Sequence, residues 1–278
     1  MSASINNRAG TNKADTHKTT IVKKTMNTQP KKQIYLFGTC LIDMFYPQAG
    51  LDAVALLELS GYEVIYPQAQ TCCGQPPYNS GFKSPAVKVA KQTIQLFSAQ
   101  DIPLIVPSAS CAAMIKHHYP TFFITNSLEA KQAKQLGQRT FELIDFIADK
   151  LPYNRQPLRP PIKVTLHESC SALREMNVAS TWRHVLNKLD NVKVTYPENR
   201  QECCGFGGTF SIKSDAVSAV MTQDKCQNLI NTAAKQILSG DCGCLMNIGE
   251  HLKFEGNKNP CLHLASFLVE HFGLNHDH

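Results

Sequence analysis

The chain has 278 residues, of which 43% are hydrophobic, so it is long enough for two domains with ordinary globular cores. No apolar run reaches the roughly 18 residues of a membrane-spanning helix, and the first 20 residues lack the apolar stretch of a secretion signal. We therefore expect a cytoplasmic protein without a transmembrane segment.

The net charge of +6 comes from the N-terminal segment. Residues 1–32 contain seven Lys or Arg and one acid, Asp15, which leaves 21 basic and 21 acidic residues in the rest of the chain. So polar a segment cannot bury a core, and we predict a disordered basic tail over 1–32. Nucleic-acid binding is not expected, because it would place basic residues on a folded face.

Eleven cysteines are many for a chain without a secretion signal. A reducing cytosol disfavours structural disulfides, so cysteines in spaced sets indicate metal ligation or redox chemistry. Cys226 and Cys261 stand apart from these sets, inside predicted helical stretches. We expect both to be buried as small hydrophobic side chains.

The first repeat is predicted over 33–151. It opens with a β-prone stretch, QIYLFG, followed by Cys40 and a helical pattern. A second strand, YEVIYP, leads to Cys72 and Cys73, and FKSPAV then begins a helix with a proline in its first turn. A third strand, IPLIVP, precedes Cys111, and ELIDFIADKL has apolar residues at helical spacing.

The segment 152–161, PYNRQPLRPP, contains four prolines and is predicted to be a linker. The second repeat, over 162–274, has the same order of elements. Its corresponding stretches are KVTLHESC, VKVTYP, ECCG, IKSDAV, QILSGDCGC and HLASFLVEHF.

Strands that alternate with helices predict an α/β fold. We expect two tandem homologous repeats, each a small, largely parallel sheet with flanking helices. Because ligands gather at the carboxyl ends of parallel strands, the cysteines that follow the strands are expected to meet there, as one cysteine cluster in each repeat.

Each repeat contributes four of these cysteines at nearly the same spacing. In the first repeat 31 and 37 residues separate them, and in the second 32 and 39. Thiolates are soft ligands of zinc and of iron–sulfur clusters. We call the sets the first quartet, with Cys40, Cys72, Cys73 and Cys111, and the second quartet, with Cys170, Cys203, Cys204 and Cys244.

Iron–sulfur clusters, one in each repeat, explain the quartets best, and zinc at one or both sites remains an alternative. Neither repeat has the Cys-x2-Cys knuckle of structural zinc sites, and its absence also argues against a thiol–disulfide oxidoreductase. Gly74 and Gly205 leave room for a ligand and offer amides to its sulfur. His167 and Glu168 are expected to tune the second cluster.

The twice-repeated pattern Cys…Cys-Cys-Gly…Cys resembles the CCG cysteine-rich domain family, which is found in heterodisulfide reductases, in the glycolate oxidase iron–sulfur subunit and in succinate:quinone reductases. The stretches GTCLIDMFYPQAGLDAVALLE, HESCSALRE, ECCGFGGTFSIK and GDCGCLMNIGEHL are similar to the lactate utilization protein A family, whose members are iron–sulfur subunits of L-lactate dehydrogenase complexes. This resemblance covers residues 33–272.

The chain departs from the family pattern at one position of each repeat. The pattern ends each set in Cys-x2-Cys, whereas this chain has Ser108 and Asp241 at the first of those two positions, with Cys242 as a shifted counterpart. Ser108, Asp241 and Cys242 are therefore weaker candidate ligands. Four thiolates suffice for an ordinary 4Fe–4S cluster.

The resemblance implies an electron-transfer subunit of a complex that oxidises L-lactate to pyruvate. Its partners would be other subunits, including a second iron–sulfur protein, and the chain would be an oxidoreductase component that is not catalytic alone. The alternatives are a subunit of a glycolate oxidase or heterodisulfide reductase-type complex, or a zinc-stabilised assembly scaffold. The sequence has no G-x-G-x-x-G motif opening a nucleotide-binding unit, and we assign no catalytic residue.

Overall fold

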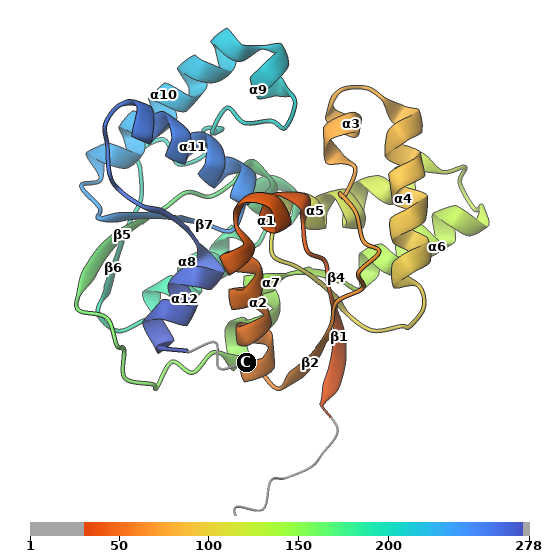
Figure 1. Cartoon of the computed structure of the whole chain (residues 1–278), viewed down its shortest axis with the longest axis horizontal. Coiled ribbons are helices and arrows are strands. Elements are labelled where there is room, and N and C mark those ends of the chain that lie inside the picture. Colours follow the sequence, from red (N-terminus) through yellow and green to blue (C-terminus); the bar gives the residue numbers. More distant parts are fainter. Residues whose placement is uncertain (1–30, 275–278) are drawn as a thin grey trace, which may run out of the picture. The chain divides into compact units, whose positions relative to one another are not determined.

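Two four-stranded parallel sheets form the framework of residues 31–274, the part of the chain that the computed structural model describes (Figure 1). The first sheet has the order β2-β1-β3-β4, with strands β1 (Lys32–Leu36), β2 (Tyr62–Ile65), β3 (Leu104–Val106) and β4 (Thr140–Glu142). The second has the order β6-β5-β7-β8, with strands β5 (Ile162–Leu166), β6 (Val192–Thr195), β7 (Gln236–Ser239) and β8 (Cys261–His263).

The two sheets have the same register, which confirms the predicted duplication. Tyr35 on β1 lies opposite Ile65 on β2, and Thr165 on β5 lies opposite Thr195 on β6. All the strand pairs are parallel. The carboxyl ends of the strands therefore lie at one edge of each sheet, as expected.

The fourth strand of each sheet was not predicted. β4 and β8 are three residues long, too short to show a period of two along the chain. The expectation that Cys261 lies in a helix is wrong, because Cys261 begins β8 and pairs with Ile237. Cys226 does lie in a helix and is 2% exposed, as predicted.

Helices connect the strands and cover both sheets. Those of the first repeat are α1 (Cys40–Phe45), α2 (Pro47–Leu59), α3 (Gln75–Asn79), α4 (Lys83–Phe97), α5 (Ala109–Ala113), the π-helix η1 (Met114–His118), the 3-10 helix η2 (Tyr119–Phe122), α6 (Leu128–Gln138), α7 (Leu143–Ile147) and the 3-10 helix η3 (Ala148–Lys150). Those of the second are the π-helix η4 (Ser171–Glu175), α8 (Ala179–Asn187), α9 (Phe210–Lys213), α10 (Asp215–Asn231), α11 (Cys242–Phe254) and α12 (Leu264–Phe272).

The predicted tail and linker frame these elements. The tail over 1–32 lies outside the described residues except for its last two, and Lys32 already belongs to β1. Residues 152–161 contain neither helix nor strand. Within residues 31–274, none of the helices combines the length and apolar character that crossing a bilayer requires.

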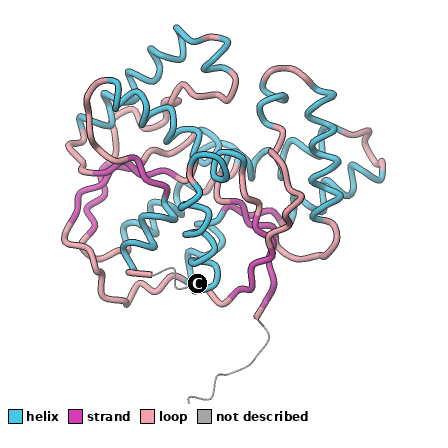
Figure 2. The backbone as a smooth tube through the Cα atoms, in the orientation of Figure 1, coloured by secondary structure: helices cyan, strands magenta, loops and turns pink. Residues whose placement is uncertain are grey.

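One of three hydrophobic clusters is shared by the two repeats. It contains Ile34 and Leu56 from the first repeat and Val164, Trp182 and Phe267 from the second, all fully buried. α2 packs against α12, and α7 packs against α8, so each repeat places its last α-helix on the other. Figure 2 shows helices between the two groups of strands. Each such buried side chain contributes about 1.5–3 kcal/mol to folding.

Glu142 and His263, which end β4 and β8 at corresponding positions, each make a buried hydrogen bond to the other repeat. Trp182 Nε1 donates to Glu142 Oε2 at 3.0 Å, and His263 Nε2 lies 3.1 Å from the carbonyl oxygen of Pro107. Glu142 and His263 each cap the last α-helix of their own repeat, α7 and α12. The carboxyl edges of the two sheets are thereby held against one another.

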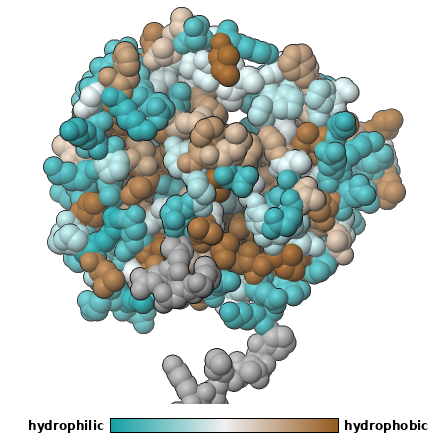
Figure 3. Space-filling model, viewed as in Figure 1, coloured by the Kyte–Doolittle hydropathy of each residue, from teal (hydrophilic) through white to brown (hydrophobic). Residues whose placement is uncertain are grey.

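The exterior is mixed in character. On the face in Figure 3, hydrophobic and hydrophilic residues are interspersed. Large apolar side chains such as Ile124, Ile212 and Phe254 are mostly exposed.

Candidate metal centres

The first quartet gathers at the carboxyl edge of the first sheet. Cys40 begins α1 after β1, Cys72 and Cys73 lie in the loop after β2, and Cys111 lies in α5 after β3. The Sγ atoms of Cys40 and Cys72 are 3.7 Å apart, and those of Cys73 and Cys111 are 3.3 Å apart. Four thiols from three loops therefore meet, in the arrangement that the spacing predicts.

The second quartet occupies the corresponding place in the second sheet. Cys170 precedes η4, Cys203 and Cys204 follow β6, and Cys244 lies in the first turn of α11. Hydrogen bonds link Cys203 to Cys170 and to Cys204, and Cys204 to Cys244. Cys170 is exposed, whereas Cys204 and Cys244 are buried.

Both quartets line one cavity of about 510 Å³. Its wall is largely apolar and includes Leu41, Phe206 and Met246. A hydrogen bond connects the segments that follow the two Cys-Cys-Gly sequences. It joins the hydroxyl groups of Ser80 and Thr209, whose oxygens are 2.5 Å apart. A single ion needs no more room than a water molecule, about 30 Å³, so the cavity has room for larger groups.

The two Cys-Cys-Gly turns are built alike. The amide N–H of Gly74 donates to Cys72 Sγ at 3.4 Å, and that of Gly205 donates to Cys203 Sγ at 3.4 Å. Both glycines have positive φ, 81° and 84°, which disfavours any other residue. These amides therefore donate to cysteine sulfur in both turns, and donation to the sulfur of a bound cluster stays a prediction.

Buried and half-buried polar side chains, which sequence reasoning missed, hydrogen-bond to the backbone of the turns. Tyr119 donates its hydroxyl to the carbonyl oxygen of Cys73 at 2.9 Å. In the second repeat Thr222 and Asn247 donate to the carbonyl oxygen of Cys204, at 3.0 and 2.8 Å. These residues come from elements distant in the sequence, where nothing marks them as partners of the cysteines.

The hydrogen bonds among the thiols lower the pKa of some cysteines in each quartet and raise the pKa of others. Those from Cys40 and then Cys73 lower the pKa of Cys72, while the bond to Cys72 raises the pKa of Cys40. The bond from Cys170 lowers the pKa of Cys203 in the same way. Metal ligands must be deprotonated, so a metal that binds the protonated Cys40 thiol releases its proton.

Ser108 and Asp241, the weaker candidates, contact each other. Ser108 Oγ donates to Asp241 Oδ1 at 2.6 Å, and Ser110 donates to the same oxygen from its hydroxyl at 2.8 Å and its amide at 3.0 Å. Ser169 donates its hydroxyl to Asp241 Oδ2. Cys242, the third weaker candidate, also lines the cavity and is 1% exposed.

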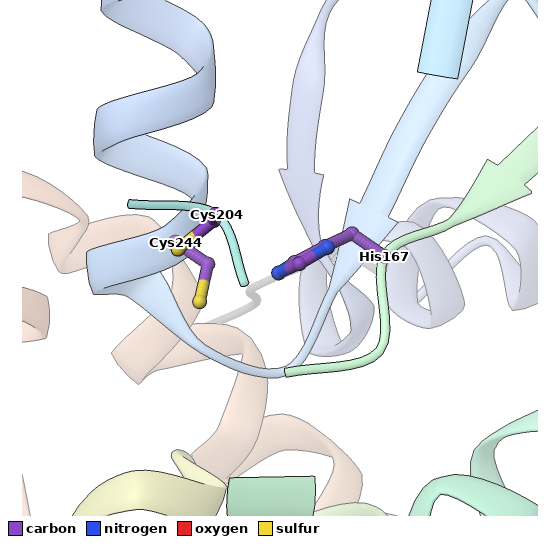
Figure 4. A group of neighbouring side chains, drawn as sticks. All are labelled: His167, Cys204 and Cys244. Carbon is purple, nitrogen blue, oxygen red and sulfur yellow. The ribbon is translucent and has the colours of Figure 1, made fainter. Parts of the chain in front are cut away.

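His167 and Glu168 differ in what they touch. The Glu168 carboxylate forms ion pairs with Arg183 and, at 3.6 Å, with Arg200. A ring nitrogen of His167 and the Sγ atoms of Cys204 and Cys244 all lie within 4.8 Å of one another (Figure 4). Neither ring nitrogen has a hydrogen-bond partner within the described residues, although His167 is 1% exposed.

The residues present fit a thiolate-bound metal or iron–sulfur group. Each site supplies four sulfurs, and the second adds a buried imidazole without a partner among residues 31–274. At Gly205 a Cβ would lie 2.5 Å from Thr222 Oγ1, so the turn that carries Cys203 and Cys204 can pack on α10 only with glycine there. Soft sulfur donors of this kind select zinc or iron–sulfur clusters.

Comparisons with known proteins match this description. The family model described as "Cysteine-rich domain" (CCG) matches residues 34–116 and 164–249, segments that contain both quartets. Lactate utilization protein A 1 of Bacillus anthracis is 37% identical over 87% of this chain and 99% of its own length. Lactate utilization protein A of a Geobacillus species is 39% identical over 85% of this chain and 98% of its own.

A solved structure shares the fold. The crystal structure of a hypothetical protein from Helicobacter pylori superposes with a TM-score of 0.64 at 14% identity, covering 89% of this chain and 50% of the other. This chain thus spans about half the length of that protein. From the two matched segments and the identity to the curated relatives, the chain belongs to the CCG cysteine-rich domain family and, within it, to the lactate utilization protein A family.

Proposed function

We propose that the chain is an iron–sulfur electron-transfer subunit of a system that uses L-lactate. The observation that carries the proposal is the pair of cysteine quartets at the carboxyl edges of two parallel sheets, lining one cavity. Each quartet would hold one 4Fe–4S cluster, because each supplies four thiols and all eight thiols line that cavity.

The cysteines would bind the clusters, and the surrounding residues would position them. The amides of Gly74 and Gly205 already donate to sulfur in each turn. The apolar wall, with Leu41 and Phe206, would exclude water from the inner sulfurs. Bound clusters would supply reversible one-electron acceptance.

The relatives are named lactate utilization proteins, which supports the proposal that L-lactate is the substrate of the system. Oxidation of L-lactate to pyruvate releases two electrons and two protons, and two one-electron centres have capacity for that pair. We propose that other subunits, including a second iron–sulfur protein, bind lactate and deliver its electrons to this chain.

Metal analysis of the anaerobically purified protein tests the proposal. We expect about eight irons and eight sulfides per chain, the content of two 4Fe–4S clusters, with a brown chromophore that reductants bleach. Deleting the gene in its native host should abolish growth on L-lactate and leave growth on glycolate intact. Loss of growth on glycolate instead would favour the glycolate oxidase alternative.

A zinc-stabilised scaffold is the second candidate, and two distances favour it. The 3.7 Å between Cys40 and Cys72 Sγ is close to the separation of about 3.8 Å for two sulfurs bound at about 2.3 Å to one tetrahedral ion. His167, Cys204 and Cys244 lie within 4.8 Å of one another and are typical zinc ligands. Zinc without sulfide in a colourless protein would exclude the clusters and favour this candidate.

A further inference from the structure

The two quartets have similar geometry but different neighbours. The backbone amide of Phe37 donates to Ile105, and that of His167 donates to Leu238, at corresponding ends of β1 and β5. Phe37 and His167 therefore occupy the same position in the two repeats. Both side chains are buried, at 0% and 1% exposed. The first site thus has a phenyl ring where the second has an imidazole.

The imidazole of His167 is directed at the second quartet. Figure 4 shows its ring pointing from the end of β5 toward Cys204 and Cys244. A neutral imidazole has one N–H donor, and a buried donor without a partner is costly. Sulfur of a group bound by these cysteines would accept that hydrogen bond, which no residue in 31–274 accepts.

A second difference lies on the long helices α4 and α10. Their buried positions match one for one, and Lys225 on α10 corresponds to Thr93 on α4. Lys225 is 0% exposed and donates to the carbonyl oxygen of Asn199 at 2.9 Å. It also donates to the carbonyl oxygen of Arg200 at 3.5 Å, so its ammonium is held against the loop that leads into Cys203 and Cys204. Thr93 brings no charge to the first site.

Hydrogen bonds to cluster sulfur and nearby positive charge both favour the reduced, more negative state of a cluster. We propose that the second quartet forms the centre of higher reduction potential, because His167 and Lys225 act on it while Phe37 and Thr93 stand in their places at the first. This inference rests on the proposed function. One electron passing between the centres would oxidise the first and reduce the second, with no bond made or broken.

A redox titration of the loaded, full-length protein, followed by electron paramagnetic resonance, tests this order. The wild type should show two waves. His167→Phe, which installs the residue of the first repeat, should lower only the higher wave, by a tenfold change in the reduction equilibrium, or about 59 mV for a one-electron couple. Lys225→Met should lower the same wave independently. Pulsed measurements should detect a nitrogen coupling that His167→Phe removes.

Two further variants sharpen the result. His167→Gln keeps an N–H donor and should restore much of the lost potential. His184→Phe changes an exposed histidine on α8 and should leave both waves in place. Two loaded clusters with equal potentials, or a shift of the lower wave in His167→Phe, would overturn the order and leave the proposed function standing. Zinc without sulfide would overturn both.

Discussion

Ser108 Oγ donates a hydrogen bond of 2.6 Å to Asp241 Oδ1, joining the two repeats at corresponding positions of their third loops. Asp241 also accepts from Ser110 and Ser169, and its side chain is 2% exposed. The third loops carry Cys111 and Cys244, and Ser169 directly precedes Cys170. The carboxylate therefore joins the segments that carry three of the thiols and links one repeat to the other.

Replacing Asp241 by alanine should destabilise the fold. The change leaves the buried hydroxyls of Ser108 and Ser169 without their acceptor. Hydrogen bonds to a charged group contribute about 1.5–3 kcal/mol each, so we expect a loss of at least about 3 kcal/mol in the free energy of unfolding. Urea denaturation measures it, with the exposed Asp149→Ala as control.

The Asp241→Asn variant separates this structural role from metal ligation. Asparagine keeps an Oδ1 acceptor for Ser108 and Ser110, so we expect full metal content and a smaller loss of stability. Loss of metal from one centre, with the denaturation midpoint unchanged, would make Asp241 an oxygen ligand instead.

Single substitutions in the quartets should act on one site at a time. Cys73→Ser and Cys204→Ser each remove a buried thiolate from one quartet, and each should halve the iron and sulfide content. Cys226→Ser is the matched control. Cys226 is equally buried but belongs to neither quartet, and its Sγ donates to the carbonyl oxygen of Ile248 at 3.7 Å. Unchanged iron in Cys204→Ser would refute that ligand assignment.

Gly205 is predicted to tolerate no side chain. A Cβ there would lie 2.5 Å from Thr222 Oγ1 and 2.7 Å from the carbonyl oxygen of Ser218, at a φ of 84°. Gly205→Ala should therefore displace the turn and lower the metal content of the second site. Gly61→Ala has a similar φ of 88° with nothing within 4 Å, so it should cost only the backbone strain of about 1–2 kcal/mol. Equal stability and metal content in the two variants would contradict this account.

The sequence was sufficient to predict the features that follow from the succession of residues along the chain. Strand-ending cysteines at repeated spacing predict the parallel sheets and the meeting of each quartet, because parallel strands present their carboxyl ends together. The short strands β4 and β8 were missed, since three residues such as those of β8 show no periodicity. Tertiary pairing with β3 and β7 makes them strands.

Contacts between distant segments could not be predicted. Nothing in the sequence indicates that Asp241 accepts hydrogen bonds from Ser108, or that Lys225 is buried when a lysine on a helix is usually exposed. The shared core of α2 and α12 also depends on how the repeats pack, which the pattern of each repeat alone does not specify.

Glu142 should make the stability of the fold depend on pH. Its Oε2 accepts from Trp182 Nε1 and the amide of Asp145, both at 3.0 Å, whereas Oε1 has no partner within residues 31–274. Burial raises the pKa of Glu142 from 4.5 to about 8. The folded protein therefore keeps a proton that the unfolded chain releases between these values. Stability from this group is complete below pH 4.5 and falls as the pH rises through 8.

Glu142→Gln should remove this dependence, because glutamine keeps an acceptor for Trp182 and does not titrate. From about pH 5 to about pH 9 the wild type should lose stability relative to the variant, on the order of 1.4 kcal/mol for each unit of pKa shift. Thermal unfolding of both proteins across that range measures the difference. Glu58→Gln, at an exposed position on α2, should follow the wild type. Parallel curves for wild type and Glu142→Gln would mean that Glu142 is ionised in the folded state, with its charge stabilised by the indole of Trp182 and the amides at the start of α7.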